Sequence, residues 1–170
     1  NYMGLANSYS ILGEHEKALE HFDLAIVANA KFQHLPTQEA KAMMLKGVTY
    51  KRMGKREKAE EMYRQTKEYL EPYVAREARP GRAAVMMSAN LSNWATLHRE
   101  IGRHDLAEPM FRQALKLQIA VTGWDHQDVA VIASNLGNSL SQQERELEAR
   151  ELLEFALRVR GCPRIRGGVH

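Results

Sequence analysis

The chain has 170 residues, of which 44% are hydrophobic and 26% are charged. These proportions are typical of folded soluble proteins and argue against extensive disorder. The formal net charge is +3, from 24 Lys and Arg against 21 Asp and Glu. That excess is too slight to indicate nucleic-acid binding, because such domains concentrate a strong basic excess on one face. We therefore expect no nucleic-acid partner.

Hydropathy and cysteine content bear on the location of the protein. The sequence contains no run of 18 apolar residues and no basic segment followed by an apolar one near residue 1, so we expect neither a membrane span nor a signal peptide. The single cysteine, Cys162, permits no internal disulfide. A reducing, cytoplasmic environment fits this cysteine usage.

Four alanines mark an internal repeat. They are Ala18, Ala59, Ala107 and Ala149, and successive alanines are 41, 48 and 42 residues apart. Twelve residues before each alanine stands a small residue, which is Ala6, Gly47, Ala95 or Gly137. Four residues after each alanine stands a large apolar residue, which is Phe22, Tyr63, Phe111 or Leu153. Nine residues before each alanine stand Tyr9, Tyr50, His98 and Leu140.

These positions have a common physical meaning. Small residues let two helices approach closely, because a larger side chain would push the backbones apart. The large apolar residues fill the space between neighbouring helix pairs. Five residues before three of the alanines stand Gly13, Gly54 and Gly102, and Glu144 breaks this pattern in the fourth segment. A glycine suits the left-handed residue that ends a helix, so each segment reads as two helices joined by a tight turn.

The pattern predicts eight helices and no strands. Their expected ranges are 1–12 with 15–34, 37–53 with 56–78, 82–101 with 105–122, and 126–143 with 146–160. Pro80 and Gly81 mark the break before the fifth helix, since proline disfavours helix in the residue before it. We expect Pro109 in the first turn of its helix, and Asp125 as an N-cap with Asp128 in the turn that follows.

The offsets resemble those of the tetratricopeptide repeat family over nearly the whole chain. Residues 107–115 and 123–130 resemble the kinesin-light-chain type of this repeat. The resemblance implies an all-α fold, a right-handed superhelical solenoid of four antiparallel helix pairs. We expect one domain over residues 1–160, with repeats at about 1–34, 37–78, 82–122 and 126–160, and a flexible tail at 161–170. The spacings exceed the usual period of about 34 residues, which we interpret as longer helices.

No set of residues indicates catalysis. His15 and His21 are six residues apart, as are His98 and His104, whereas a helical metal pair needs a spacing of three or four. The cluster at 125–128 has a capping role, and no phosphate-binding loop or nucleophile elbow is present. We therefore expect no catalytic residues, no metal, no cofactor and no enzyme activity.

The resemblance also implies a binding site. Stacked helix pairs form a concave face, and in this family the first helix of each pair lines it. Asparagine amides there can both donate to and accept from the backbone of a bound segment, and Lys or Arg attracts carboxylates. The sequence thus predicts a scaffold that binds an extended or short helical peptide of acidic character. The expected groove residues are Asn7, Lys51, Arg52, Asn93, Thr96, Arg99, Asn135, Asn138 and Gln142.

Two alternatives accompany this hypothesis. The groove residues can equally be read as polar side chains on an exposed face of a soluble repeat protein. The chain can also be an architectural module that self-assembles through the ends of its stack. Both ends are expected to expose apolar surface, which favours further repeats in a larger protein or a homo-oligomer.

Overall fold

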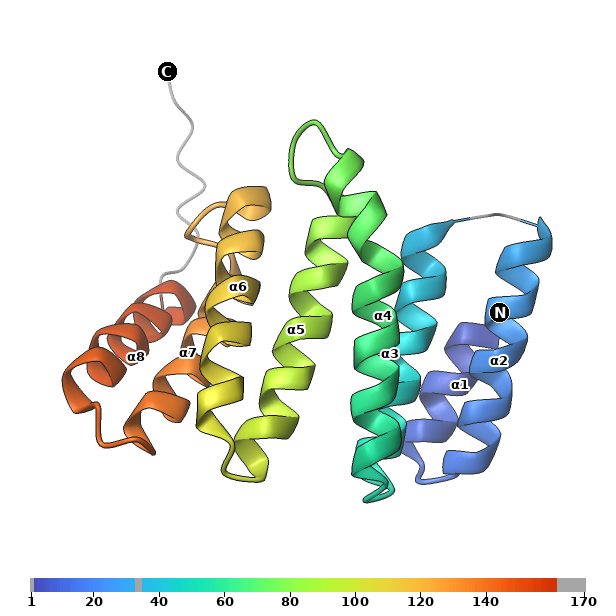
Figure 1. Ribbon diagram of the computed structural model, residues 1–170, viewed down its shortest axis with the longest axis horizontal. Coiled ribbons are helices and arrows are strands. Elements are labelled where there is room, and N and C mark those ends of the chain that lie inside the picture. The colour runs from blue at the N-terminus through green and yellow to red at the C-terminus, as the bar shows by residue number, and fades with distance from the viewer. Residues whose placement is uncertain (1, 33–34, 162–170) are drawn as a thin grey trace.

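The computed structural model describes residues 2–32 and 35–161. Within these residues the chain forms eight α-helices and no strand, and Figure 1 shows them following one another along the long axis of the molecule. The helices are α1 (Tyr2–Ile11), α2 (His15–Phe32), α3 (Pro36–Arg52), α4 (Arg56–Arg76), α5 (Arg82–Glu100), α6 (His104–Thr122), α7 (Gln127–Ser141) and α8 (Glu146–Gly161).

The helices pack as four antiparallel pairs, and each pair packs on the next. The prediction of an all-α solenoid is confirmed. Where both ends of a helix are described, they lie within two residues of the predicted positions. The flexible tail was predicted to start at Gly161, but this residue is the last of α8. The remainder of that expected tail, 162–170, lies outside the described residues.

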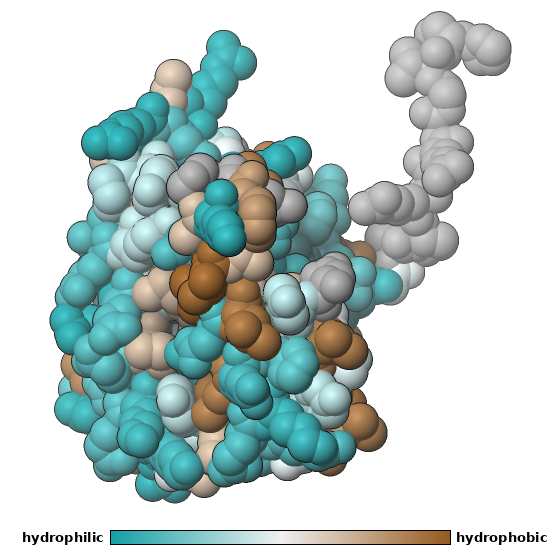
Figure 2. All heavy atoms as spheres, turned by 90° about the vertical axis from the view of Figure 1, so that its right-hand side faces the viewer, coloured by the Kyte–Doolittle hydropathy of each residue, from teal (hydrophilic) through white to brown (hydrophobic). Residues whose placement is uncertain are grey.

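The α1–α2 end of the stack exposes apolar side chains, as the sequence predicts. Leu5 is 49% exposed and Leu12 is 72% exposed. Figure 2 looks onto this end and shows an apolar area at its centre, bordered by hydrophilic side chains. At the opposite end, Leu157 of α8 is 68% exposed. Among the described residues, each end of the stack therefore exposes apolar side chains of the kind that are buried at the junctions between pairs.

The small residues lie where two helices approach most closely. A β-carbon added to Gly47 of α3 would lie 2.7 Å from a ring atom of Tyr63 in α4, whose side chain is fully buried. A β-carbon on Gly137 of α7 would lie 3.0 Å from Leu153 and 3.2 Å from the carbonyl oxygen of Ala149. These contacts confirm the reason for which the sequence repeats small residues at this position.

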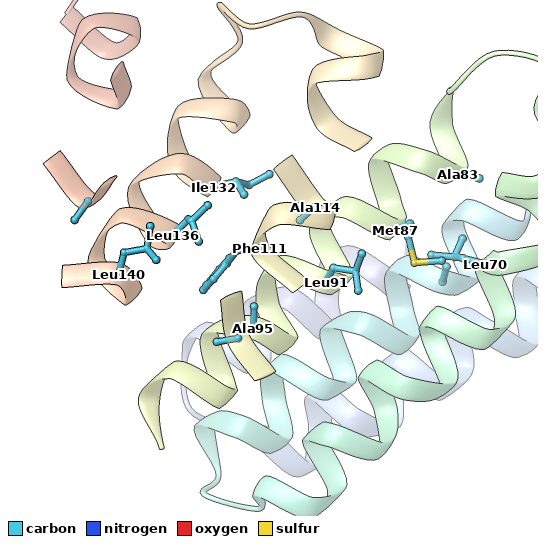
Figure 3. Close-up of a cluster of buried hydrophobic side chains, with 13 residues drawn as sticks. Leu70, Ala83, Met87, Leu91, Ala95, Phe111, Ala114, Ile132, Leu136 and Leu140 are labelled. Atoms are coloured by element: carbon cyan, nitrogen blue, oxygen red, sulfur yellow. The ribbon is translucent and has the colours of Figure 1, made fainter. Parts of the chain in front are cut away.

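The largest core cluster runs across the junctions between pairs. In Figure 3, Leu70 of α4 lies against Met87 of α5, and Phe111 of α6 lies towards Leu136 of α7. Phe111 is fully buried, and its position repeats that of Phe22 and Tyr63. This cluster spans the second to fourth pairs, and a separate cluster joins Phe22 of the first pair to Ala42 of α3. Apolar contacts therefore cross each junction, which makes the stacked pairs depend on their neighbours for stability.

The turns inside the pairs adopt the expected left-handed backbone. Gly13, Gly54 and Gly102 have φ of 81°, 72° and 76°. In the fourth pair Glu144 takes this role with φ of 61°, and it is the only non-glycine residue with positive φ in the described part of the chain. The fourth turn therefore keeps the same geometry at a conformational cost that glycine avoids.

We expect Glu144→Gly to raise the free energy of unfolding by about 0.5–1 kcal/mol, because relief of left-handed strain exceeds the entropy that glycine loses on folding. The neighbouring Gln143→Gly is the control, since the φ of Gln143 is not positive, and it should lower stability. Urea denaturation monitored by circular dichroism measures both. A loss of stability in Glu144→Gly would show that this turn is not strained.

Two local predictions are wrong. Helix α6 begins at His104, so Pro109 is its sixth residue and lies beyond the first turn. Its missing N–H deprives the carbonyl of Asp105 of a helical hydrogen bond. At the start of α7, the capping side chain belongs to His126, whose Nδ1 accepts from the backbone N–H of Asp128 at 3.2 Å. Asp125 precedes this cap, whereas Asp128 does lie in the first turn.

His98 is a buried packing residue in α5, with 1% of its surface exposed. Its ring stacks on Trp94 with centroids 6.0 Å apart, and Nε2 lies 3.7 Å from a carboxylate oxygen of Glu60 in α4. Burial lowers the pKa of the His98 imidazole below its usual value, and the Glu60 carboxylate offsets only part of this effect. His98 is therefore neutral in the folded chain near neutral pH.

This depressed pKa predicts a loss of stability in mild acid. Below the ordinary histidine pKa of about 6.5, the unfolded chain binds a proton at His98 that the folded chain does not, so stability falls as pH falls. The thermal midpoint should drop between about pH 7.5 and about pH 5.5, and it should drop less in His98→Leu. Leucine is the chosen replacement because Leu140 of α7 occupies the repeat position that His98 occupies in α5. Equal drops in the two chains would exclude His98 as the cause.

Candidate functional site

The first helices of the four pairs form the inner side of the stack. Helix α3 packs against α1 and α5, and α5 packs against α7. Over residues 2–32 and 35–161, the second helices α2, α4, α6 and α8 make no such contacts with one another. Because the first helices lie closer together than the second helices, they line the concave face and the second helices form the convex face.

The structure places eight of the nine expected groove residues on these first helices. Asn7 is in α1, Lys51 and Arg52 are in α3, and the others are distributed over α5 and α7: Asn93, Thr96, Arg99, Asn135 and Asn138. The ninth, Gln142, is the C-cap residue just after α7. The residues therefore come from four helices that lie side by side, although they span most of the sequence.

Polar contacts tie the first helices together. The Lys51 ammonium in α3 lies 2.9 Å from the Glu100 carboxylate in α5. The Arg52 guanidinium donates to the hydroxyl of Ser10 in α1 at 3.0 Å, and this hydroxyl lies 3.1 Å from that of Thr49. Two of the expected cationic groups are thus already engaged with neighbouring helices. They fix the spacing of α1, α3 and α5.

The asparagines repeat at equivalent positions. Asn93 and Asn135 both stand fourteen residues before the alanine of their pair, and both are half-buried. Asn7 and Asn138 both stand eleven residues before theirs, and both are exposed. Asn93 and Asn135 lie in neighbouring pairs, so these two amides stand at matching heights, which suits the repeating backbone of an extended segment. Asn7 and Asn138 lie in the first and fourth pairs, at opposite ends of the stack.

Two further groove residues are placed more deeply than expected. Thr96 donates its hydroxyl to the carbonyl of Ser92 at 2.8 Å, so only its lone pairs remain for a ligand. Arg99 is half-buried, and its Nε is buried with no hydrogen-bond partner among the described residues. An unpaired buried donor is costly to the fold.

Glu100 and Ser10 are the residues that sequence reasoning missed. Glu100 stands seven residues before Ala107, as Arg52 stands seven before Ala59. Glu100 therefore occupies a repeat position from which the sequence had already predicted a groove residue in the second pair. The pairing itself was not visible, because Lys51 and Glu100 are 49 residues apart and meet only when α3 packs on α5.

In residues 2–32 and 35–161, no group of three or more His, Cys, Asp or Glu side chains could hold a metal ion. Among the same residues, no helix is long and apolar enough to cross a membrane. Cys162 lies outside the described residues.

Comparison with known proteins defines the family. The sequence matches tetratricopeptide repeat models over residues 86–160, and over 1–32 and 40–68. The chain belongs to the tetratricopeptide repeat family. No curated protein sequence matches the chain. Membership of this family supports a general role as a protein-interaction scaffold.

Several solved structures share the fold. BtubC (BKLC) from P. vanneervenii is 22% identical with a TM-score of 0.74, and the match covers 99% of this chain and 67% of that one. The apo quorum sensor NprR from B. thuringiensis is 19% identical with a TM-score of 0.76, covering 96% and 43%. A putative kinesin light chain repeat protein from Podospora anserina is 18% identical with a TM-score of 0.64, covering 94% and 74%. This chain spans less than half of NprR.

Proposed function

We propose that this chain is a scaffold that binds an extended or short helical peptide segment of a partner protein on its concave face. The observation that carries the proposal is the matched set of amides on α5 and α7, where Asn93 and Asn135 occupy one repeat position and Asn138 lies one turn further on. Amides at matching positions can hydrogen-bond the backbone of a bound segment whatever its side chains.

The contacts between the first helices support this role. The ion pair between Lys51 and Glu100 and the hydrogen bond from Arg52 to Ser10 hold α1, α3 and α5 at fixed separations. A face that is already ordered loses less entropy when a ligand binds. Structural similarity to a protein named as a quorum sensor agrees with a ligand-binding role.

The proposal includes a preference for acidic segments. Lys51, Arg52 and Arg99 are three cations on this face, and Glu100 neutralises one of them. Because Glu100 and Ser10 already engage Lys51 and Arg52, Arg99 is the main candidate for contact with a ligand carboxylate. The proposed setting is cytoplasmic, with protein partners and without nucleic acid, membrane or cofactor.

The test is affinity capture from a lysate of the source cells with three forms of the chain. The groove variant is Asn93→Ala, Arg99→Ala, Asn135→Ala, Asn138→Ala. The control variant carries four substitutions on the convex helices α4 and α6 and removes the same net charge: Arg64→Ala, Glu68→Ala, Gln113→Ala, Lys116→Ala. All of the control positions are exposed. Circular dichroism establishes that both variants fold.

We expect specific proteins to bind the unsubstituted chain and the control variant but not the groove variant. For a peptide derived from such a protein, the dissociation constant should rise roughly tenfold or more in the groove variant, since central contacts cost over 1 kcal/mol each when truncated. Added salt should weaken binding if the segment is acidic. Equal capture by all three forms would show that the concave face is not the binding site.

A further inference from the structure

Leu5 stands at a repeat position whose side chain contacts the preceding helix pair in each of the other three pairs. Its counterparts in the other pairs are Lys46, Trp94 and Leu136. Lys46 pairs with Asp23 of α2 at 2.5 Å, Trp94 packs on the cluster that contains Tyr63, and Leu136 packs on the cluster that contains Phe111. Each of the three thus contacts the preceding pair. Leu5, with 49% of its surface exposed, has no preceding pair among the described residues.

The α7–α8 end offers the complementary surface. Leu157 in α8 is 68% exposed. Its counterparts in the first and third pairs, Ile26 and Leu115, pack on clusters that include residues of the following pair. In the second pair the counterpart is Lys67, which pairs with Glu71 of its own helix. Beside Leu157 lies a hollow of about 400 Å³. It is lined by Glu146, Leu147, Ala149, Arg150, Leu153, Glu154 and Leu157. At the inner junction between α6 and α7, the corresponding space is occupied by residues of α7 that include Leu136.

An ion-pair ring closes the junction between the third and fourth pairs. Glu108 and Arg112 of α6 face Arg145, which directly precedes α8, and Glu148 in the first turn of α8. Arg145 lies 2.6 Å from Glu108, and Arg112 lies 3.2 Å from Glu148. Within each side, Arg112 lies 2.8 Å from Glu108, and Arg145 lies 2.6 Å from Glu148. Four alternating charges thus join the two pairs.

At the exposed end of the fourth pair, the two positions that correspond to Glu108 and Arg112 carry side chains of the opposite charge. Ala107 and Ala149 are 42 residues apart, so the counterparts of Glu108 and Arg112 are Arg150 and Glu154. These two residues form an ion pair at 2.7 Å. A carboxylate followed by a guanidinium in α6 has therefore become a guanidinium followed by a carboxylate in α8.

At the exposed end of the first pair, the two positions that correspond to Arg145 and Glu148 also carry side chains of the opposite charge. Ala18 and Ala149 are 131 residues apart, so the counterparts of Arg145 and Glu148 are Glu14 and Lys17. Their side chains form an ion pair at 2.5 Å. If the α7–α8 end of one copy were placed on the α1–α2 end of another, Arg150 would face Glu14 and Glu154 would face Lys17. Each of these four charges is opposite to its counterpart at the junction between the third and fourth pairs, so the charges would again alternate in a ring.

This complementarity is not a property of every junction. At the junction between the first and second pairs, the same four positions hold Leu19, Asp23, Lys55 and Lys58. Those residues cannot form an alternating ring, and the described structure has none there. The match between the α1–α2 end and the α7–α8 end is therefore specific to the sequences of these two helix pairs.

We propose that this chain assembles head to tail with a second copy of itself, with the α7–α8 end of one copy stacked on the α1–α2 end of the next. Leu5 would enter the hollow beside Leu153 and Leu157, and the ion-pair ring would close across the same contact. The contact joins two different surfaces, so it leaves one end of each kind free and continues into an open chain of copies. The concave face is not covered by this contact, so the proposal is independent of the groove.

The mass of the 170-residue chain in solution tests the proposal, by sedimentation velocity and light scattering over a wide range of protein concentrations. The average mass should rise with concentration beyond that of a dimer. Two variants then separate the ends. Leu5→Glu blocks the α1–α2 end by placing a carboxylate beside Glu154, and Leu157→Glu blocks the α7–α8 end. Both positions are exposed in the single copy, so both variants should fold, which circular dichroism checks.

Each blocked variant alone should be monomeric, and an equimolar mixture should form a heterodimer and nothing larger. The control is Gln113→Glu, which adds one carboxylate at an exposed position of α6, a helix of the third pair. It should assemble as the unsubstituted chain does. Lys17→Glu should weaken assembly about two- to fivefold, and adding Glu154→Lys in the same chain should restore it.

Three results would overturn the proposal: a monomer at all concentrations for the unsubstituted chain, a closed dimer in either blocked variant alone, or no heterodimer in the mixture. A closed dimer in one variant would indicate a symmetric contact between like ends. None of these results bears on capture of partners by the concave face, so the two proposals fail separately.

Discussion

Close approach of two helices at a small residue is the constraint on which the rest of the structure depends. In the second pair, Gly47 lies directly against the ring of Tyr63, and in the fourth pair Gly137 lies against the backbone of Ala149. Ala6 and Ala95 hold the same position in the first and third pairs, and both are fully buried. Four pairs with the same internal spacing can stack in the same way, so the solenoid follows from a requirement at one position of each repeat.

Both proposed surfaces derive from this stacking. Because the first helices lie closer together than the second helices, side chains from distant parts of the sequence meet on one face, where Lys51 of α3 reaches Glu100 of α5. The same repetition leaves half of a junction at each end of the stack, seen in the exposure of Leu5 and Leu157. The groove and the ends are thus separate consequences of one packing rule, and a partner on one leaves the other accessible.

The repeat made most of the fold predictable from the sequence. The predicted helix ends lie within two residues of the observed ones. The prediction used the alanines at 18, 59, 107 and 149 and the glycines of the turns, and both kinds of position are determined by local steric requirements. Features that depend on contacts between pairs could not be predicted in this way. The partner of Lys51 lies 49 residues away in sequence. Likewise, the sequence offered an acidic cap at Asp125, whereas the imidazole of His126 caps α7.

The packing rule is tested most directly by the free energies of unfolding of Gly47→Ala and Gly4→Ala. Both glycines lie inside helices, so alanine improves helix propensity at each by up to about 1 kcal/mol. Gly4 is exposed on α1, and its substitution should be neutral or stabilising. At Gly47 the added methyl group meets the buried ring of Tyr63, and stability should fall by about 1–3 kcal/mol. A gain at Gly47 equal to that at Gly4 would contradict the account.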